Sequence, residues 1–460
     1  MVMDTGQKIF AFLDAVQKST PILLAITMVL VVFVCIKECR KKLEKRKNQL
    51  KKASKGKAKG IIFGKKGRSL IYSPTQQEGH VAVFGGSGLG KTSALLIPTL
   101  RSWNGTSFTI DISGDICKNV DIQRKMIYEP ANPNSIPYNI FGTIDQMDDE
   151  DDQNEALEEI AFLMMPDDER MSDTSKFFQV EGRKILTAAL IAFYHRGMDF
   201  IPICEKIVQS GWKELFQSID ETGYVKATQY INSFQGASEQ NTAGCKQSCD
   251  MVLKLFATNE KVKKTIRRPR EGEKDFLPAR IENHNVFVVV DDSKLKLYAP
   301  LLHIITAQSL EYFSQRSSEK KHTILFCLDE FASLGKMEIT DALRKLRKKR
   351  IRIMMLTQSM ADIDLIYGHD ERMAMMNNYR FKVVLGASDT DTQEYFAKLI
   401  GYQDTKKHSK SHNAGQTTFT ESEAKEWAIE PAELDRLKKE LVLLHPDGYM
   451  RLKKNYYYKK

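Results

Sequence analysis

One stretch of 20 residues, beginning at His80, constrains the fold of this chain more than any other. It reads HVAVFGGSGLGKTSALLIPT: a short apolar run, a glycine-rich segment and then a helical pattern. The fixed positions of the pattern G-x-x-x-x-G-K-[ST] are filled by Gly85, Gly90, Lys91 and Thr92. Glycines let consecutive backbone N–H groups turn toward a polyphosphate, and the positive end of the following helix adds to their field. The stretch therefore predicts a strand, a phosphate-binding loop and a helix.

The loop pattern assigns roles to the side chains within it. Lys91 is expected to reach the β- and γ-phosphates of ATP, and the Thr92 hydroxyl is expected to bind Mg²⁺. An ordinary glycine-rich turn is the alternative, but such a turn does not require a strand before it and a helix after it. We therefore predict ATP and Mg²⁺ as cofactors. The expected nucleotide contacts are Gly85, Gly86, Ser87, Gly88, Leu89, Gly90, Lys91, Thr92 and Ser93.

The net charge of +10 is concentrated in one short run. Residues 37–59 contain twelve of the 69 Lys and Arg residues and two of the 59 acidic residues, so the rest of the chain carries 57 of each sign. This balance argues against a protein coated with basic surface, although it leaves room for a local basic patch. The basic run itself suits contact with anionic lipid or with nucleic acid, and lipid is the simpler interpretation beside a membrane span.

An uncharged stretch precedes the basic run. Residues 19–36 contain no charged side chain over 18 residues, and Pro21 stands where a helix would begin. That length just spans the roughly 30 Å hydrocarbon core of a bilayer, and basic residues flank spans on the cytoplasmic side. A buried soluble helix and an uncleaved signal are the alternatives. The sequence thus predicts a single-pass protein of the cell membrane, with an N-terminal transmembrane helix and residues 37–460 in the cytoplasm.

Short apolar runs alternate with helical stretches in two parts of the chain, which predicts the parallel strands of an α/β sheet. The expected strands are 81–84, 108–112, 126–128, 286–290, 324–328, 351–357 and 381–385. Between the two parts, residues 177–195 and 243–256 have apolar positions spaced three and four apart, which indicates helices. The tail, 402–460, is polar and mixed, with a short helix expected near 433–440.

A second group of candidate site residues follows two of these strands. The run TILFCLDEF ends an apolar strand with Asp329 and Glu330. A carboxylate in this position can hold Mg²⁺, and a second one can orient or deprotonate the attacking water. Gln358 follows the next strand and is placed to sense the γ-phosphate, with a helix cap as the alternative role. A basic cluster, residues 344–352, precedes that strand; one of its arginines could complete a neighbouring subunit's site, while most of it is expected to be a solvated face.

Taken together, these motifs resemble the VirD4/TraG family of type IV secretion coupling proteins. The resemblance covers roughly residues 61–458. It rests on LDEFASLGKMEITDALRKLRKKRIRIMMLTQSMADIDLIYG (328–368), FFQVEGRKILTAAL (177–190), NNYRFKVVLGASDTDTQEYFAKLIG (377–401) and EPAELDRL (430–437).

The resemblance implies a RecA-like P-loop NTPase domain with an inserted all-α domain. The implied domains are a membrane segment 1–36, a basic juxtamembrane linker 37–60, the first part of the NTPase domain 61–154, the all-α insertion 155–275, and the second part with the C-terminal tail 276–460. The implied catalytic residues are Lys91, Glu330, Gln358 and Arg347, with Thr92 and Asp329 on Mg²⁺. Arg347, eleven residues before Gln358, matches a position where the family usually has arginine.

The resemblance also implies partners. The protein would be an ATPase that assembles as a homohexamer at the membrane and brings relaxase-bound single-stranded DNA to the channel proteins of a type IV secretion system. Two alternatives stay open. One is a receptor ATPase that passes protein effectors to such a channel, and the other is an FtsK-like DNA translocase, which the all-α insertion disfavours.

Overall fold

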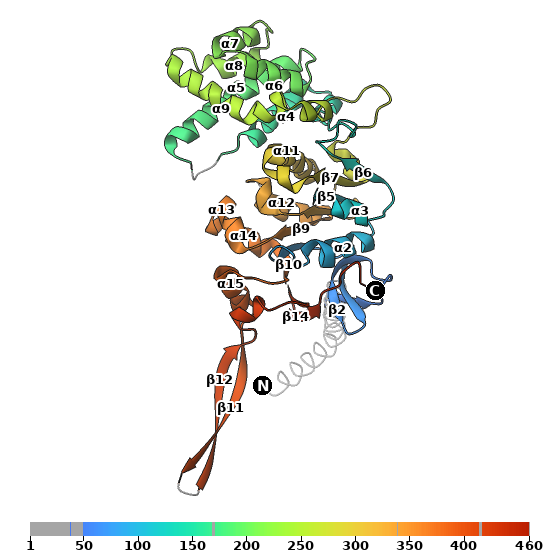
Figure 1. Ribbon diagram of the computed structural model, residues 1–460. Helices are drawn as coiled ribbons and strands as arrows, with labels where there is room; N and C mark the ends of the chain where they lie inside the picture. The colour runs from blue at the N-terminus through green and yellow to red at the C-terminus, as the bar shows by residue number, and fades with distance from the viewer. Residues whose placement is uncertain (1–36, 38–48, 168–170, 338, 414–415, 460) are drawn as a thin grey trace, which may run out of the picture. The chain divides into compact units, whose positions relative to one another are not determined.

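The computed structural model describes residues 37, 49–167, 171–337, 339–413 and 416–459 (Figure 1). Within it, residues 52–460 form one compact unit. The side chains of residues 406–424 are outside the description, although their strands are included.

The prediction of a single-pass membrane protein requires correction. Across the described ranges, no helix has both the length and the apolar character that crossing a bilayer requires. Residues 19–36, on which the prediction rested, lie outside the described residues. An uncharged stretch of that length stands at the lower limit for a span, so composition alone was a weak basis for the prediction. Within the expected linker 37–60, Lys51–Ala53 forms a short strand, and the linker itself remains a prediction.

A twelve-stranded sheet forms the centre of the described unit, in the order β1-β3-β2-β14-β13-β10-β4-β9-β8-β5-β7-β6. From β10 to β6 all neighbouring strands are parallel. These parallel strands are β4 (His80–Phe84), β5 (Thr106–Ile112), β6 (Lys125–Tyr128), β7 (Asn285–Val290), β8 (Ile324–Leu328), β9 (Ile351–Thr357) and β10 (Tyr379–Val384). The α/β prediction is confirmed, and all seven expected strands are present within a few residues of their expected bounds.

The central parallel strands are largely apolar because helices cover the sheet. Every residue of β4, β8 and β9 is buried, as expected for central strands of a parallel sheet. The helices of this part of the chain are α2 (Ile97–Ser102), α3 (Asp115–Asn119), α11 (Leu295–Ser314), α12 (Ile339–Leu346), α13 (Met360–Tyr367), α14 (His369–Asn378) and α15 (Thr390–Ile400). A wider helical turn, η1 (Lys91–Leu96), leads into α2.

An extension that is antiparallel from β13 to β3 continues the sheet beyond β10, and it was not predicted from the sequence. Its strands are β1 (Lys51–Ala53), β2 (Gly60–Lys66), β3 (Ser69–Pro74), β13 (Glu440–His445) and β14 (Gly448–Lys453). The helix expected near 433–440 is wrong: a short turn of helix covers Pro431–Leu434, and β13 begins at Glu440. Two further strands, β11 (Tyr402–Asn413) and β12 (Gln416–Trp427), pair with each other in a separate hairpin.

Helices occupy the segment between β6 and β7. They are α4 (Glu150–Met164), α5 (Asp173–Tyr194), α6 (Phe200–Gln209), α7 (Trp212–Asp220), α8 (Val225–Asn232), α9 (Glu239–Thr258) and α10 (Glu260–Thr265), and Figure 1 shows α4–α9 packed together. Side chains cap several of these helices; Ser172 accepts the N–H of Ser175 at the start of α5, for example. The bounds 155–275 of an all-α domain remain a prediction.

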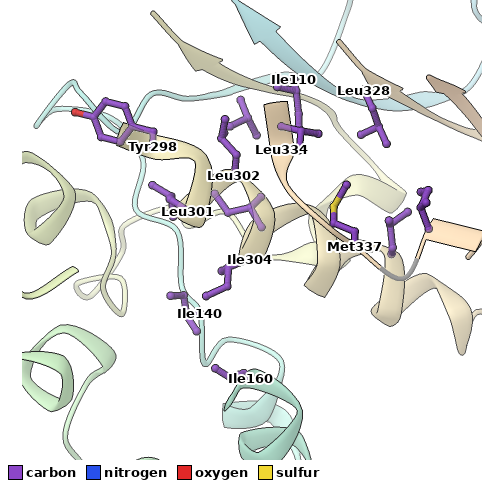
Figure 2. Packing of buried hydrophobic residues seen from close by; sticks show 14 of the residues in the cluster. Ile110, Ile140, Ile160, Tyr298, Leu301, Leu302, Ile304, Leu328, Leu334 and Met337 are labelled. Carbon is purple, nitrogen blue, oxygen red and sulfur yellow. The ribbon is translucent and has the colours of Figure 1, made fainter. Parts of the chain in front are cut away.

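Helix α11 joins the helical segment to the sheet through one apolar core. Leu302 lies on the side of the strand residues Ile110 and Leu328, and Ile304 lies on the side of Ile140 and Ile160 (Figure 2). A helix that is apolar on both sides must be buried on both sides. The core therefore supports β5 and β8 from one face and fixes the position of the end of β8, which Asp329 follows.

His80, the first residue of β4, carries a pH-dependent contribution to stability. Its Nδ1 accepts the N–H of Ile353 at 2.9 Å, and its Nε2 lies 2.8 Å from the carbonyl oxygen of Leu343. Burial lowers the pKa of His80 to about 3. The unfolded chain therefore takes up this proton first, near pH 6.5, so the fold is expected to lose stability as pH falls from 6.5 toward 3.

We expect this histidine to account for about 2 kcal/mol of the stability lost between pH 7 and pH 5. Urea unfolding of the wild type and of His80→Asn at both pH values measures it. The variant should start less stable at pH 7 but lose less between the two values. An equal loss in both proteins would contradict the assignment.

Candidate nucleotide-binding site

The glycine-rich loop lies at the carboxyl edge of the parallel strands, directly after β4. Gly88 and Gly90 have φ angles of 75° and 97°, which lie in the left-handed region that glycine adopts without steric cost. Helix η1 begins at Lys91, so its free N–H groups face the loop. This is the geometry of a phosphate cradle, because the loop and the helix start present backbone donors to the same place.

Lys91 is held over the loop by two oxygen partners. Its Nζ donates to the carbonyl oxygen of Gly85 at 2.7 Å and lies 3.5 Å from Oε1 of Glu330. The lysine is buried, so its charge is screened little by water. The ammonium group therefore stands between the loop and the end of β8, where the phosphates of a nucleotide would bind.

Asp329 and Thr92 meet across the site. The Thr92 hydroxyl lies 3.4 Å from Oδ2 of Asp329, at the long end of hydrogen bonding. Burial, together with the nearby Glu330, raises the pKa of Asp329 to about 7, although Lys91 opposes the change. A hydroxyl and a buried carboxylate are oxygen ligands of the kind that Mg²⁺ prefers, and a cation would relieve the desolvated charge. The residues present therefore fit this ion.

Glu330 has a strained backbone that directs its carboxylate into the site. Its φ of 45° is unusual for a residue with a side chain and costs on the order of 1 kcal/mol. In this conformation Oε1 faces Lys91, and Oε2 accepts from Nε2 of Gln358 at 3.4 Å. Strain of this kind persists where a site requires it. Lys91, Thr92, Asp329, Glu330 and Gln358 are thus brought together at the ends of β4, β8 and β9.

Arg347 is not part of this cluster. It lies in a short turn, Arg347–Lys349, before β9, and its Nε is 4.0 Å from Oε2 of Glu78, which precedes β4. The seven residues of β9 separate this turn from Gln358, and at about 3.3 Å per residue the separation is roughly 20 Å. Arg347 is about half exposed, with 55% of its side chain accessible. Within one subunit it therefore lies at the opposite edge of the sheet from the site.

A segment near the end of β14, which the sequence did not predict to be part of the site, touches the loop. The N–H of Tyr457 donates to the carbonyl oxygen of Ser93 at 3.0 Å, and the ring of Tyr456 lies against Gly90. The two parts are far apart in sequence and meet through pairing of β13 and β14 with the sheet. The run of three tyrosines, 456–458, was the only available signal.

A buried strand, a glycine-rich loop with its lysine, and a carboxylate that follows β8, the second strand along from β4, define a P-loop protein of the α/β class. The family described as Type IV secretory system Conjugative DNA transfer matches residues 33–460. The chain belongs to this family, as the sequence motifs predicted.

Two curated relatives show how much of a longer protein the chain resembles. Protein VirD4 of Rhizobium rhizogenes is 25% identical over 429 residues, which cover 87% of this chain and 62% of that protein. Protein VirD4 of Agrobacterium fabrum is 26% identical over 379 residues, which cover 77% of this chain and 55% of that protein. The chain thus spans less than two thirds of the length of these relatives.

Among solved structures, the bacterial conjugative coupling protein TrwBdeltaN70 in complex with sulphate has a TM-score of 0.69 at 19% identity, covering 87% of this chain and 90% of that one. TrwB in complex with the ATP analogue ADPNP has a TM-score of 0.65 at 19% identity, covering 83% and 86%. TrwB with ADP and Mg²⁺ has the same score and identity, covering 83% and 85%. These likenesses show that the chain has the TrwB fold.

Proposed function

We propose that this protein is the coupling ATPase of a conjugative type IV secretion system. It uses ATP hydrolysis to bring relaxase-bound single-stranded DNA to the channel proteins and to pump it onward. The observation that carries the proposal is the meeting of Lys91 and Thr92 on the loop with Asp329 and Glu330 at the end of β8. The family membership and the nucleotide complexes of TrwB support it.

Each residue of the cluster has a distinct proposed task. Backbone donors from Gly85 to Ser93 hold the phosphates, and Lys91 neutralises charge on the β- and γ-phosphates. Thr92 and Asp329 would hold Mg²⁺, which supplies further neutralisation of the phosphate oxygens when bound. Glu330 accepts a proton from the attacking water, and Gln358, in contact with Glu330, orients that water.

Arg347 is proposed to act in the site of a neighbouring subunit. Its exposure and its distance from the site of its own chain support a role across an interface. A ring of six subunits would repeat this contact at every interface. The proposed domain division is 61–154 and 276–460 for the NTPase domain and 155–275 for the all-α insertion, and the helices α4–α10 support the last of these.

A receptor that passes protein effectors is the second candidate function, because the same motor could act on either cargo. The description of the matched family names conjugative DNA transfer, which favours DNA as the cargo. That name also disfavours the FtsK-like alternative. A response of the ATPase to DNA distinguishes the two cargo classes.

Single-stranded DNA of mixed sequence is expected to raise the ATP turnover of the full chain, because a translocase couples hydrolysis to its track. Outside residues 37–59 the basic and acidic residues are equal in number, so DNA binding must come from local contacts with phosphates. For each phosphate contacted, a tenfold rise in salt concentration should then lower the association constant for DNA by about 0.7 log units. The base sequence of the DNA should matter little. Turnover and DNA affinity measured across a salt series test both points.

Lys91→Ala is the matched control, since it should still bind DNA but show no turnover at any DNA concentration. If the wild type hydrolyses ATP but neither binds nor responds to DNA, the protein-receptor function replaces the DNA function.

A further inference from the structure

The segment Asn455–Lys459 emerges beside the phosphate loop. Strand β13 runs antiparallel to β10, and Glu440 at its start pairs with Lys453 at the end of β14. The end of β14 is therefore at the same edge of the sheet as the end of β4, where the loop begins. The following residues cross that edge next to η1.

Contacts from several elements hold this segment in place. The N–H of Tyr457 donates to the carbonyl oxygen of Ser93 at 3.0 Å, and the guanidinium of Arg101 lies 5.0 Å from the centre of the Tyr457 ring. Nζ of Lys55 donates to the carbonyl oxygen of Lys459 at 3.2 Å. The backbone near Tyr456 is thus fixed independently of the Tyr456 side chain.

The Tyr456 ring itself borders the loop. A β-carbon placed on Gly90 would be 3.1 Å from Cε1 of Tyr456, so only glycine leaves comfortable room there. The ring is partly exposed, and the exposed Lys459 places its Nζ 4.7 Å from the ring centre. The ring of Tyr458, also exposed, lies beside it with the two ring centres 5.4 Å apart and the planes tilted by 35°. Exposed side chains are displaced at little cost, so a flat ligand can reach a face of the Tyr456 ring by moving Lys459 or Tyr458.

The order of the strands decides which end of a nucleotide would lie near Tyr456. The groups that serve the γ-phosphate, Glu330 and Gln358, follow β8 and β9, on one side of β4. Strands β10, β13 and β14 are on its other side. A nucleotide whose γ-phosphate faces Glu330 must extend its ribose and base away from β9, toward the segment that follows β14.

We propose that Tyr456 forms the nucleobase platform of this site, against which the purine ring of the bound nucleotide stacks. This inference rests on the proposed function, because it needs the loop to bind a nucleotide. Stacking uses the π-face that every base has, so adenine and guanine nucleotides should bind with affinities within a few-fold of each other.

The experiment compares a ligand with a base and a ligand without one. Binding of ADP and of inorganic tripolyphosphate to the full chain, both with Mg²⁺, is measured by calorimetry. Tyr456→Ala should weaken ADP binding by about tenfold, within a range of roughly five- to a hundredfold, and leave tripolyphosphate binding unchanged. Tyr456→Phe should match the wild type for both ligands, since the ring and not the hydroxyl is required. Tyr449→Ala, on β14, is the matched control and should bind ADP and tripolyphosphate as the wild type does.

Three other outcomes would contradict the proposal, and each would point to a different explanation. Unchanged ADP binding by Tyr456→Ala means that the base lies elsewhere. Equal weakening of ADP and tripolyphosphate means that the ring only supports the loop. If the wild-type protein binds neither ligand while remaining folded, the proposed nucleotide function fails and the platform fails with it.

Discussion

Glu330→Gln is expected to bind ATP as the wild type does and to hydrolyse it about two to four orders of magnitude more slowly. Glutamine keeps the size of the side chain and its contact with Gln358, but it cannot accept a proton. The loss of negative charge beside Lys91 should not weaken nucleotide binding, because the phosphates are themselves negative. Steady-state turnover and a separate ATP titration measure the two effects.

The matched control for this prediction is Glu78→Gln. Glu78 is exposed and lies at the opposite edge of the sheet, beside Arg347. The Glu78→Gln variant should bind ATP as the wild type does and show at most a small change in ATP turnover. Normal hydrolysis by Glu330→Gln would remove Glu330 from the mechanism.

Arg347→Ala is expected to bind ATP normally and to lose most of its hydrolysis, by roughly three to five orders of magnitude if it acts as an arginine finger. The reason is positional: Arg347 lies at the edge of the sheet away from its own site, so its effect requires a neighbour. Lys348→Ala, in the same short turn, is the matched control and should hydrolyse ATP as the wild type does. ATP binding and turnover are measured for both variants.

Mixing two inactive variants separates action across an interface from action within one chain. Where an Arg347→Ala subunit supplies the site and a Glu330→Gln subunit supplies the arginine, both essential residues are intact. Partial recovery of turnover is therefore expected on mixing. Absence of recovery in assemblies shown to contain both variants would contradict a role for Arg347 in trans.

The central strands could be predicted because their pattern is local. The bounds of β8 and β9 agree with the expected ones. Strand β8 is a continuous apolar run, and β9 is apolar apart from Arg352 and Thr357; both are fully buried, and a polar residue follows each. The same logic placed Asp329, Glu330 and Gln358 at one edge, because parallel strands that share a sheet end together. Their convergence on Lys91 could be predicted from these local features.

The antiparallel extension could not be predicted in this way. Strand β14, GYMRLK, is largely exposed and alternates poorly, and β2 begins in a run rich in lysine and glycine. The two strands pair with each other across a long stretch of sequence, Lys453 with Lys65. Strand β13, which connects β14 to the rest of the sheet, pairs Val442 with Val384 of β10. Strand propensity is a property of that tertiary context. Tyr456 was missed for the same reason, since only the pairing of β14 brings it to the loop.

The most direct measurement of the proposed motor is displacement of streptavidin from biotin at the end of a single-stranded DNA track. The wild-type chain with ATP and Mg²⁺ should displace streptavidin at a rate that depends on ATP. Glu330→Gln, although bound to the same DNA, should not displace it. ATP hydrolysis by the wild type with no displacement and no stimulation by DNA would contradict a DNA-pumping ATPase.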